Sequence, residues 1–188
     1  MASGDLIKRY LLKIIEETKA LQKGSFTLSS GKKSKYYFDG RKVTLSPAGA
    51  FLTSKKIFDL IRHLDIDAIG GPTIGADPIV AAVVLISHLA GKPISGFIIR
   101  NDVKKHGTQK TIEGNLPFGG KVVIVDDTLT TGQSILKAIK EVKKENCQVV
   151  KIIVLLDRQE GGSEKLREKG YDLSAIFIAN EAGEIYPG

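Results

Sequence analysis

Apolar residues recur at helical spacing in several separate stretches of the chain. Across residues 5–22 and 47–63 they fall three and four positions apart, which predicts two amphipathic helices. Residues 77–89 are almost entirely apolar, so a helix there is expected to be buried on every side. Two further helices are predicted over residues 133–145 and 162–169.

Short runs of β-branched and aromatic residues separate these helices. Residues 26–39 predict short strands or a hairpin, whereas residues 101–119 are charged, contain Gly and Pro, and predict a long loop. Further strands are predicted over residues 67–70, 95–99, 121–125, 149–156 and 173–178. Strands that alternate with helices indicate an α/β fold: a parallel-stranded central sheet with helices on both faces. A loop as long as residues 101–119 is usually functional in a compact domain.

The composition agrees with one domain of this kind. The chain has 188 residues, 42% of them hydrophobic, which is enough for a full core. The net charge of +7 is concentrated in residues 1–62, which carry 13 basic and 5 acidic residues. Such a basic segment suits nucleic acid, or a small substrate with several phosphates.

Other features of the sequence indicate the cellular compartment. The single Cys147 excludes an intrachain disulfide and is expected to be a small buried filler in a reducing compartment. The longest apolar run, residues 79–90, is too short to cross a bilayer, and the first residues match neither a signal nor a transit peptide. We therefore expect a cytoplasmic protein with no membrane partner.

The most informative segment is residues 121–134, KVVIVDDTLTTGQS. Four β-branched apolar residues run into Asp126 and Asp127, a loop of small residues follows, and an amphipathic stretch begins at Gln133. A loop that leads from a strand into a helix N-terminus directs unpaired N–H groups at one point, where a phosphate can bind. The two carboxylates suit sugar hydroxyls, so the segment predicts a ribose-5-phosphate site.

Other phosphate loops do not fit these residues. A Walker loop requires Lys after its last Gly, and here Gln133 follows Gly132. A dinucleotide fingerprint requires three glycines, and this loop has one. Ordinary helix capping explains one Asp and one Thr, but not two adjacent Asp with three Thr.

Other chemically interesting residues also follow predicted strands. Residues 70–75 follow one strand, Arg100 follows the next, and Asp157 and Arg158 end a fourth. In a parallel sheet, ligands bind beyond the carboxyl ends of the strands. These segments are therefore expected to meet Asp126 and Asp127 at one site.

Segment 121–134 resembles the phosphoribosyl-diphosphate (PRPP) motif of the type I phosphoribosyltransferases. Three further segments resemble the orotate phosphoribosyltransferases: FTLSSGKKSKYYFDGR at 26–41, the mobile loop RNDVKKHGTQKTIEG at 100–114, and LDRQEGG at 156–162. The resemblance implies transfer of the phosphoribosyl group of PRPP to orotate, giving orotidine 5′-monophosphate and pyrophosphate in pyrimidine (UMP) synthesis. It also implies one phosphoribosyltransferase domain over 1–188, with a hood at about 1–45, joined by the C-terminal end, and a core at about 46–180.

The resemblance assigns roles to particular residues. Tyr37 would stack on orotate, Thr130 would add a hydroxyl contact, and Arg158 would hold the orotate carboxylate, since a guanidinium fork suits a planar anion. The alternatives are core packing for Tyr37 and a surface salt bridge to Glu160 for Arg158. Catalytic roles are implied for Lys104, His106, Asp126 and Asp127. PRPP would be bound by Arg100, Lys104, Lys105, His106, Asp126, Asp127, Thr128, Leu129, Thr130, Thr131, Gly132, Gln133 and Ser134.

The chemistry explains these residue types. Cleavage at the ribose C1 builds negative charge on the leaving diphosphate, and donors directed at that charge lower the barrier. His106 can supply a proton near neutral pH. Mg²⁺ is expected as cofactor without a dedicated protein cage, because it keeps waters and takes ligands from substrate phosphates, with Asp126 and Asp127 reaching it through water.

The resemblance further implies a homodimer with shared active sites and a cis peptide bond between Thr73 and Ile74. Three positions depart from the family pattern, because Asn101, Gly75 and Ser29 stand where some members carry Lys. Contacts from those three positions cannot be carried over. The alternatives are a phosphoribosyltransferase for another base, or a PRPP-sensing regulator that binds nucleic acid. Since Lys104 and His106 are both present, we expect the enzyme, with no nucleic-acid partner.

Overall fold

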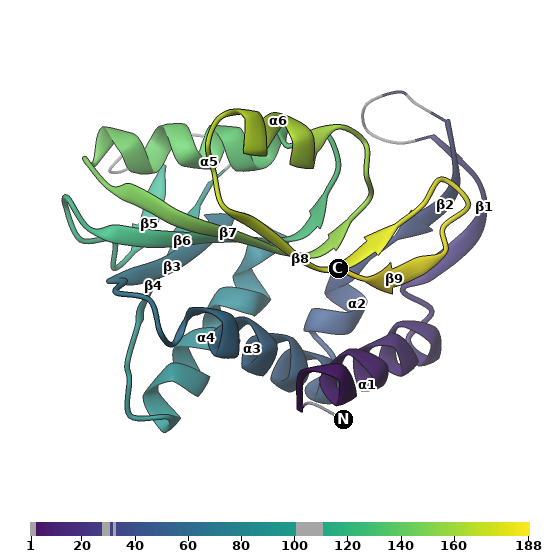
Figure 1. Ribbon diagram of the computed structural model, residues 1–188, viewed down its shortest axis with the longest axis horizontal. Helices are drawn as coiled ribbons and strands as arrows, with labels where there is room; N and C mark the ends of the chain where they lie inside the picture. Colours follow the sequence, from purple (N-terminus) through teal and green to yellow (C-terminus); the bar gives the residue numbers. More distant parts are fainter. Residues whose placement is uncertain (1–2, 28–30, 32, 101–110) are drawn as a thin grey trace.

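The computed structural model describes residues 3–27, 31, 33–100 and 111–188, with side chains from residue 6 onward. Its centre is a seven-stranded sheet in the order β5-β4-β3-β6-β7-β8-β9 (Figure 1). The five inner strands are parallel, and an antiparallel strand closes each edge. The strands are β3 (Ala68–Pro72), β4 (Ser95–Ile99), β5 (Ile112–Gly114), β6 (Lys121–Leu129), β7 (Gln148–Asp157), β8 (Leu173–Ala179) and β9 (Ile185–Pro187).

Helices cover both faces of this sheet, as expected (Figure 1). One apolar cluster joins one sheet face to the helices below it, and a second joins the other face to the helices above it. Residues of β6 alternate between the two, so that Val123 faces the first cluster and Val122 the second. The lower helices are α1 (Ser3–Glu17), α2 (Gly40–Thr44), α3 (Pro47–Ile61) and α4 (Ala76–Leu89), and the upper ones are α5 (Gln133–Lys144) and α6 (Gly162–Glu168).

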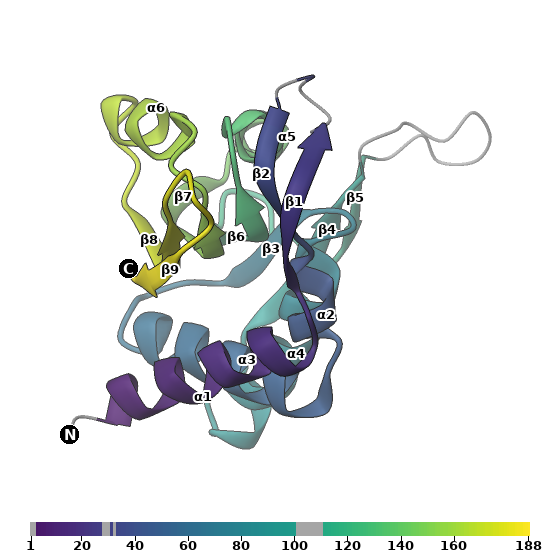
Figure 2. The same cartoon turned by 90° about the vertical axis from the view of Figure 1, so that its right-hand side faces the viewer.

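A separate hairpin of β1 (Leu21–Thr27) and β2 (Lys33–Phe38) stands beside β9, and Figure 2 looks onto this end of the molecule. The turn between β8 and β9 lies close to the hairpin. A Cβ atom on Gly183 would lie 2.7 Å from the ring of Tyr36, and Gly183 has a φ of +77°. Only Gly suits both the conformation and the contact, so the C-terminal end packs against the hairpin.

Two predicted elements differ from those in the structure, and one strand was not predicted. The helix predicted over 5–22 ends at Glu17, because Lys19 turns into the left-handed region and Leu21 already pairs with Phe38. Part of the expected loop 101–119 is strand, since Ile112–Gly114 pairs with β4. The short edge strand β9 had not been predicted at all; three residues are too few to show a period.

Helix α4 is buried on one face only, contrary to the expectation for residues 77–89. Ala81, Leu85 and Leu89 are exposed and form one stripe along the helix, and Ile74, in the turn before the helix, is exposed as well. α4 packs on α3 and on the sheet with its other face. An apolar sequence therefore did not distinguish a helix buried in the core from one with an apolar outer face.

Other expectations are confirmed. The peptide bond between Thr73 and Ile74 is cis, and Cys147 is buried and carries a free thiol. Within the described part of the chain, no helix is both long and apolar enough to cross a membrane.

Candidate active site

The carboxyl ends of β6 and β7 bring the phosphate-loop segment and Arg158 side by side. Leu129 pairs with Asp157 in the sheet, and the next backbone N–H, that of Arg158, donates to the carbonyl of Leu129 at 2.9 Å. Adjacent strands lie about 4.8 Å apart, so Thr130 and Arg158 leave the sheet as neighbours. The predicted convergence of these strand ends is confirmed.

Asp126 lies at the centre of this arrangement and is almost fully buried, with 6% of its surface exposed. One carboxylate oxygen accepts the backbone N–H of Asp127 at 2.9 Å, and the other accepts the Ser134 hydroxyl at 3.3 Å. Burial, followed by the charge of Asp127, raises the pKa of Asp126 well above its ordinary value. The site therefore holds a carboxylate that gains stability when a cation or a hydrogen-bond donor binds.

Asp127 faces the segment that follows β2. A Cβ atom on Gly40 would lie 2.8 Å from an Asp127 oxygen, so the start of α2 touches this carboxylate. Burial raises the pKa of Asp127, and the positive charge of Arg41 opposes that rise. Arg41 is held in place by Asp39, whose Oδ1 accepts from its Nε at 2.9 Å. The segment after the hairpin thus supplies a cation close to Asp127.

The loop after Asp127 has the form of an anion site. Gly132 precedes α5 with a φ of +76°, and no side chain caps this helix within the described residues. The N–H groups of the first turn are thus available to a ligand, and the helix dipole favours negative charge there. Gly162 packs directly against the loop, because a Cβ atom on it would lie 2.8 Å from the backbone nitrogen of Gly132.

Arg158 lies in a cavity of about 550 Å³ between the hairpin and the turn after β7. The side chain is 6% exposed and stacks on the ring of Tyr36, with its central carbon 4.4 Å from the ring centroid. Its Nε donates to Tyr36 Oη at 3.2 Å and lies 3.0 Å from Glu160 Oε1 in an ion pair, and Nη2 donates to Ser34 Oγ at 3.0 Å. The cavity is lined by Lys33, Ser34, Lys35, Tyr36, Arg158, Gln159, Glu160, Gly161 and Glu181.

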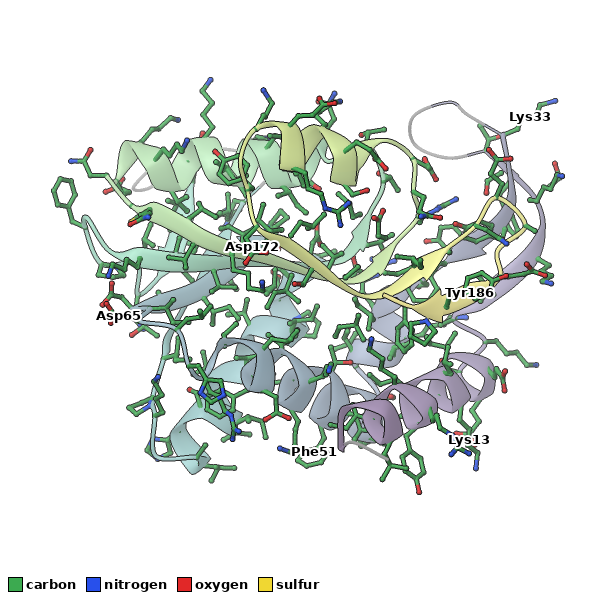
Figure 3. The ribbon with its side chains drawn as sticks, viewed as in Figure 1. Lys13, Lys33, Phe51, Asp65, Asp172 and Tyr186 are labelled. Carbon is green, nitrogen blue, oxygen red and sulfur yellow. The ribbon has the colours of Figure 1, made fainter. Side chains whose placement is uncertain are left out.

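These contacts define what the cavity can bind. A guanidinium carries five N–H donors, and those contacts use only some of them. Glu160 Oε2 is buried and has no hydrogen-bond partner among the described residues. Lys33, at the hairpin, adds positive charge at the rim (Figure 3). A planar anion that also offers a donor would match this set of groups.

Tyr37 lies on the opposite side of β2 from Tyr36. It is 38% exposed, and it lines a smaller cavity of about 220 Å³ with Arg41, Ile74 and Asp127. Its ring is 5.9 Å from that of Phe26. Successive residues of a strand face opposite sides, so Tyr36 lies against Arg158 while Tyr37 faces the cavity beside Asp127. The stacking of Tyr37 on orotate stays a prediction.

The other predicted residues divide into three groups. Thr128, Thr130 and Thr131 are half-buried along the phosphate loop, Gln133 is exposed, and the Leu129 side chain is buried in the core, so only its backbone can serve the site. Arg100 is half-buried, 3.7 Å from Glu113. The predictions for Ser29, Asn101, Lys104, Lys105 and His106 concern residues outside the described part of the chain.

Sequence reasoning missed several residues of the site: Ser34, Tyr36, Gly40 and Arg41. The ion pair between Arg158 and Glu160, which was the alternative reading of Arg158, is present but buried, with side chains 5% and 19% exposed. Alternation along residues 33–38 could have separated Tyr36 from Tyr37, once it was known which face of the hairpin meets the core. Among the residues that the structure describes, no group of three potential ligands could hold a metal ion. Asp126 and Asp127 remain a pair of oxygen donors, which fits a magnesium ion that takes its other ligands from a substrate.

Comparison with known proteins agrees with this geometry. Residues 46–180 match the family model described as the phosphoribosyl transferase domain. The orotate phosphoribosyltransferase of Nostoc sp. is 41% identical over 98% of this chain and 89% of its own. The structure of the Mycobacterium tuberculosis orotate phosphoribosyltransferase with Fe(III) dicitrate aligns with a TM-score of 0.79, at 32% identity, over 94% of this chain and 98% of that one. Another structure of that enzyme contains PRPP and aligns with a TM-score of 0.75, at 30% identity, over the same shares of the two chains. The chain thus belongs to the orotate phosphoribosyltransferases, a group within the phosphoribosyl transferase domain family.

Proposed function

We propose that this protein transfers the phosphoribosyl group of PRPP to orotate, forming orotidine 5′-monophosphate and pyrophosphate in pyrimidine biosynthesis. The observation that carries the proposal is the buried guanidinium of Arg158 next to the phosphate loop. Arg158, which can bind an anionic planar base, thus lies about one strand spacing from the loop that can bind a sugar phosphate.

Different groups of described residues bind the two substrates. The N-terminus of α5 and the loop of residues 128–134 bind the 5-phosphate, and Asp126 and Asp127 accept from the ribose hydroxyls. Arg158 and Ser34 orient the base, so that its nitrogen faces the ribose C1. Fixing both reactants in this way lowers the entropy that the bimolecular step must lose.

The leaving diphosphate needs positive charge from elsewhere. The sequence supplies it through Arg100, Lys104, Lys105 and His106, whose groups stabilise the anion that grows as the C1–O bond breaks. Asn101 adds no charge in this loop. At Gly75, where some relatives carry Lys, a side chain would collide with the acidic pair, because a Cβ atom there would lie 2.6 Å from Asp126 Oδ1.

Magnesium is part of the proposal. Asp126 and Asp127 would hold it, through water, while the diphosphate and ribose oxygens of PRPP supply its other ligands. The ion neutralises negative charge on the diphosphate. The raised pKa values of both carboxyls support this role, because a bound cation offsets the cost of ionising buried acids.

The test of the proposed function is pyrophosphate release from PRPP and Mg²⁺ with different bases. Orotate should react, while uracil, adenine, hypoxanthine and xanthine should react poorly. Preference for a purine would favour a phosphoribosyltransferase for another base. Specific nucleic-acid binding without turnover of any base would favour a PRPP-sensing regulator. Because the cysteine thiol is free and buried, we place this reaction in the cytoplasm.

We also propose a homodimer whose sites are shared. The support is the apolar stripe of Ala81, Leu85 and Leu89 on α4, together with Ile74, an exposed residue in the turn before α4 that also lines the cavity beside Asp127. A self-complementary patch of this kind forms a closed two-fold contact. Ile74, Leu85 and Leu89 are 60%, 59% and 72% exposed in the single chain, which an apolar face of a monomer rarely is.

The dimer is tested by mixing two inactive variants, Lys104→Ala and Asp127→Asn, and letting subunits exchange. If sites are shared, a mixed dimer has one doubly defective site and one intact site, so a random mixture regains about a quarter of wild-type activity. Self-sufficient subunits would regain none. A charged variant of the stripe, Leu85→Glu, should give monomers in sedimentation, while Leu45→Glu, at another exposed leucine, is the control.

A further inference from the structure

Glu141 is a charged residue on a helix face that packs into the core. It is 8% exposed, and its neighbours Ala138 and Val142 are completely buried. Lys144 Nζ donates to both of its carboxylate oxygens, at 2.7 and 2.8 Å, and the Thr111 hydroxyl donates to Oε2 at 2.9 Å. An ion pair with an exposed lysine does not require a buried carboxylate, whereas the contact with Thr111 does.

Thr111 occupies a particular place in the chain. Its carbonyl accepts the backbone N–H of Arg100 at 2.8 Å, and the following residue, Ile112, pairs with Ile99. Arg100 and Thr111 are therefore the described residues on either side of segment 101–110, which carries Lys104 and His106 in the sequence. The Thr111–Glu141 hydrogen bond ties the residue after that segment to α5.

The same helix meets the other half of the site. Ser134, in the first turn of α5, donates to Asp126. Glu141 follows Ser134 by two helical turns, about 10 Å along the axis. One rigid helix is thus in contact with both the acidic pair and the root of the segment that carries the diphosphate-binding residues.

We infer that Glu141 is a positioning residue: through Thr111 it fixes the root of segment 101–110 relative to the phosphate loop. The inference rests on the proposed function, in which Lys104 and His106 act on the leaving diphosphate. Misplacing a reacting group by about 1 Å can lower a rate by about a hundredfold, so a tie at the root acts on the rate.

The state of Glu141 suits this role. Hydrogen bonds from Lys144, and to a smaller extent from Thr111, lower the pKa of Glu141 against the opposing effect of burial. The carboxylate therefore stays ionised, and hydrogen bonds to an ionised acceptor are shorter and stronger than those to a neutral one.

The experiment is a double-mutant cycle of Thr111→Val and Glu141→Leu, measured as kcat and as the Kd for PRPP. Thr111→Val keeps the shape of the side chain and removes only the hydroxyl, so it remains informative even if Glu141→Leu does not fold. Lys144→Met is the first control, because it removes the ion pair and leaves the Thr111 contact. Asp65→Asn is the second, because it breaks an exposed ion pair with Lys121 at the end of the molecule opposite the hairpin (Figure 3).

We expect each single variant of the cycle to lower kcat about three- to thirty-fold, with the Kd for PRPP changed less than about two-fold. The double variant should be no slower than the slower single one, since both remove the same contact. Asp65→Asn should keep the wild-type rate, and Lys144→Met, which leaves the Thr111 hydroxyl donating to Glu141, should lower kcat less than either single variant of the cycle.

Wild-type kcat in Thr111→Val, strictly additive losses, or a lower melting temperature with unchanged kcat would each overturn the inference. Lys104→Ala distinguishes a failure of the positioning role of Glu141 from a failure of the proposed role of segment 101–110. If that variant is inactive and Thr111→Val keeps the wild-type kcat, the positioning role alone fails. If Lys104→Ala keeps the wild-type rate, the proposed role of the segment fails, and the positioning role fails with it.

Discussion

Arg158 and Glu160 should respond differently to single and double substitution. Arg158→Met removes the cation and leaves the Glu160 carboxylate, whose side chain is 19% exposed, without its partner at 3.0 Å. Removing one partner of a buried pair costs about 3–5 kcal/mol, and we expect about 3 because Glu160 retains some solvent contact. For a chain of this size that corresponds to a fall in melting temperature of about 6–12 °C. Arg158→Met/Glu160→Gln removes both charges and should recover most of this loss.

Activity should not recover with stability. Charge-assisted hydrogen bonds contribute about 1.5–3 kcal/mol each, so losing the contacts to the orotate carboxylate should lower the ratio of kcat/KM for orotate over uracil by about a hundredfold or more. The assay is pyrophosphate release with each base, alongside thermal unfolding. Glu160→Gln is the control and should keep the ratio, since Arg158 remains. A stable double variant that still prefers orotate to the wild-type extent would refute the role given to Arg158.

Three further predictions concern the rest of the site. Because burial raises the pKa of Asp126, its contribution to stability is complete below about pH 3.9, the ordinary value, and is lost as the pH rises through the higher folded-state pKa. Asp126→Asn should therefore raise the free energy of unfolding at pH 8 while lowering activity, and the gain should vanish toward pH 3 in denaturant titrations; a variant less stable at pH 8 would contradict this. Gly75→Ala, with ordinary helical dihedrals but a Cβ atom 2.6 Å from Asp126 Oδ1, should destabilise the protein by about 1–3 kcal/mol and lower kcat/KM for PRPP. Gly91→Ala, at a φ of +70° with open space around it, should also lower stability but leave kcat/KM unchanged. Lys104→Ala and His106→Ala should each lower kcat by about a hundredfold, and PRPP binding to the free enzyme should be less affected. Wild-type rates in both variants would show that the segment has no catalytic role.

Local features of the sequence were sufficient for much of the fold. The β-branched run at 122–125 and the helical spacing after Gln133 predicted β6 and α5, because strand and helix periods are properties of neighbouring residues. The parallel topology then predicted that the segments carrying Asp127 and Arg158 lie at the same edge of the sheet, because strand ends converge there. The phosphate loop was readable for the same reason, since its strand, acids and glycine are contiguous.

Tertiary structure decided what depends on residues far apart in the chain. Tyr36 rather than Tyr37 meets Arg158, because the face that the hairpin turns inward is set by its packing on the core and on Gly183. The approach of Gly40 to Asp127 depends on how the segment after the hairpin folds back onto β6. The outer face of α4 depends on which helix surface the sheet covers, and a uniformly apolar sequence carries no information about that choice. Local periodicity therefore determined the elements and their order, whereas long-range packing determined which side chains line the cavities and which apolar surface stays exposed.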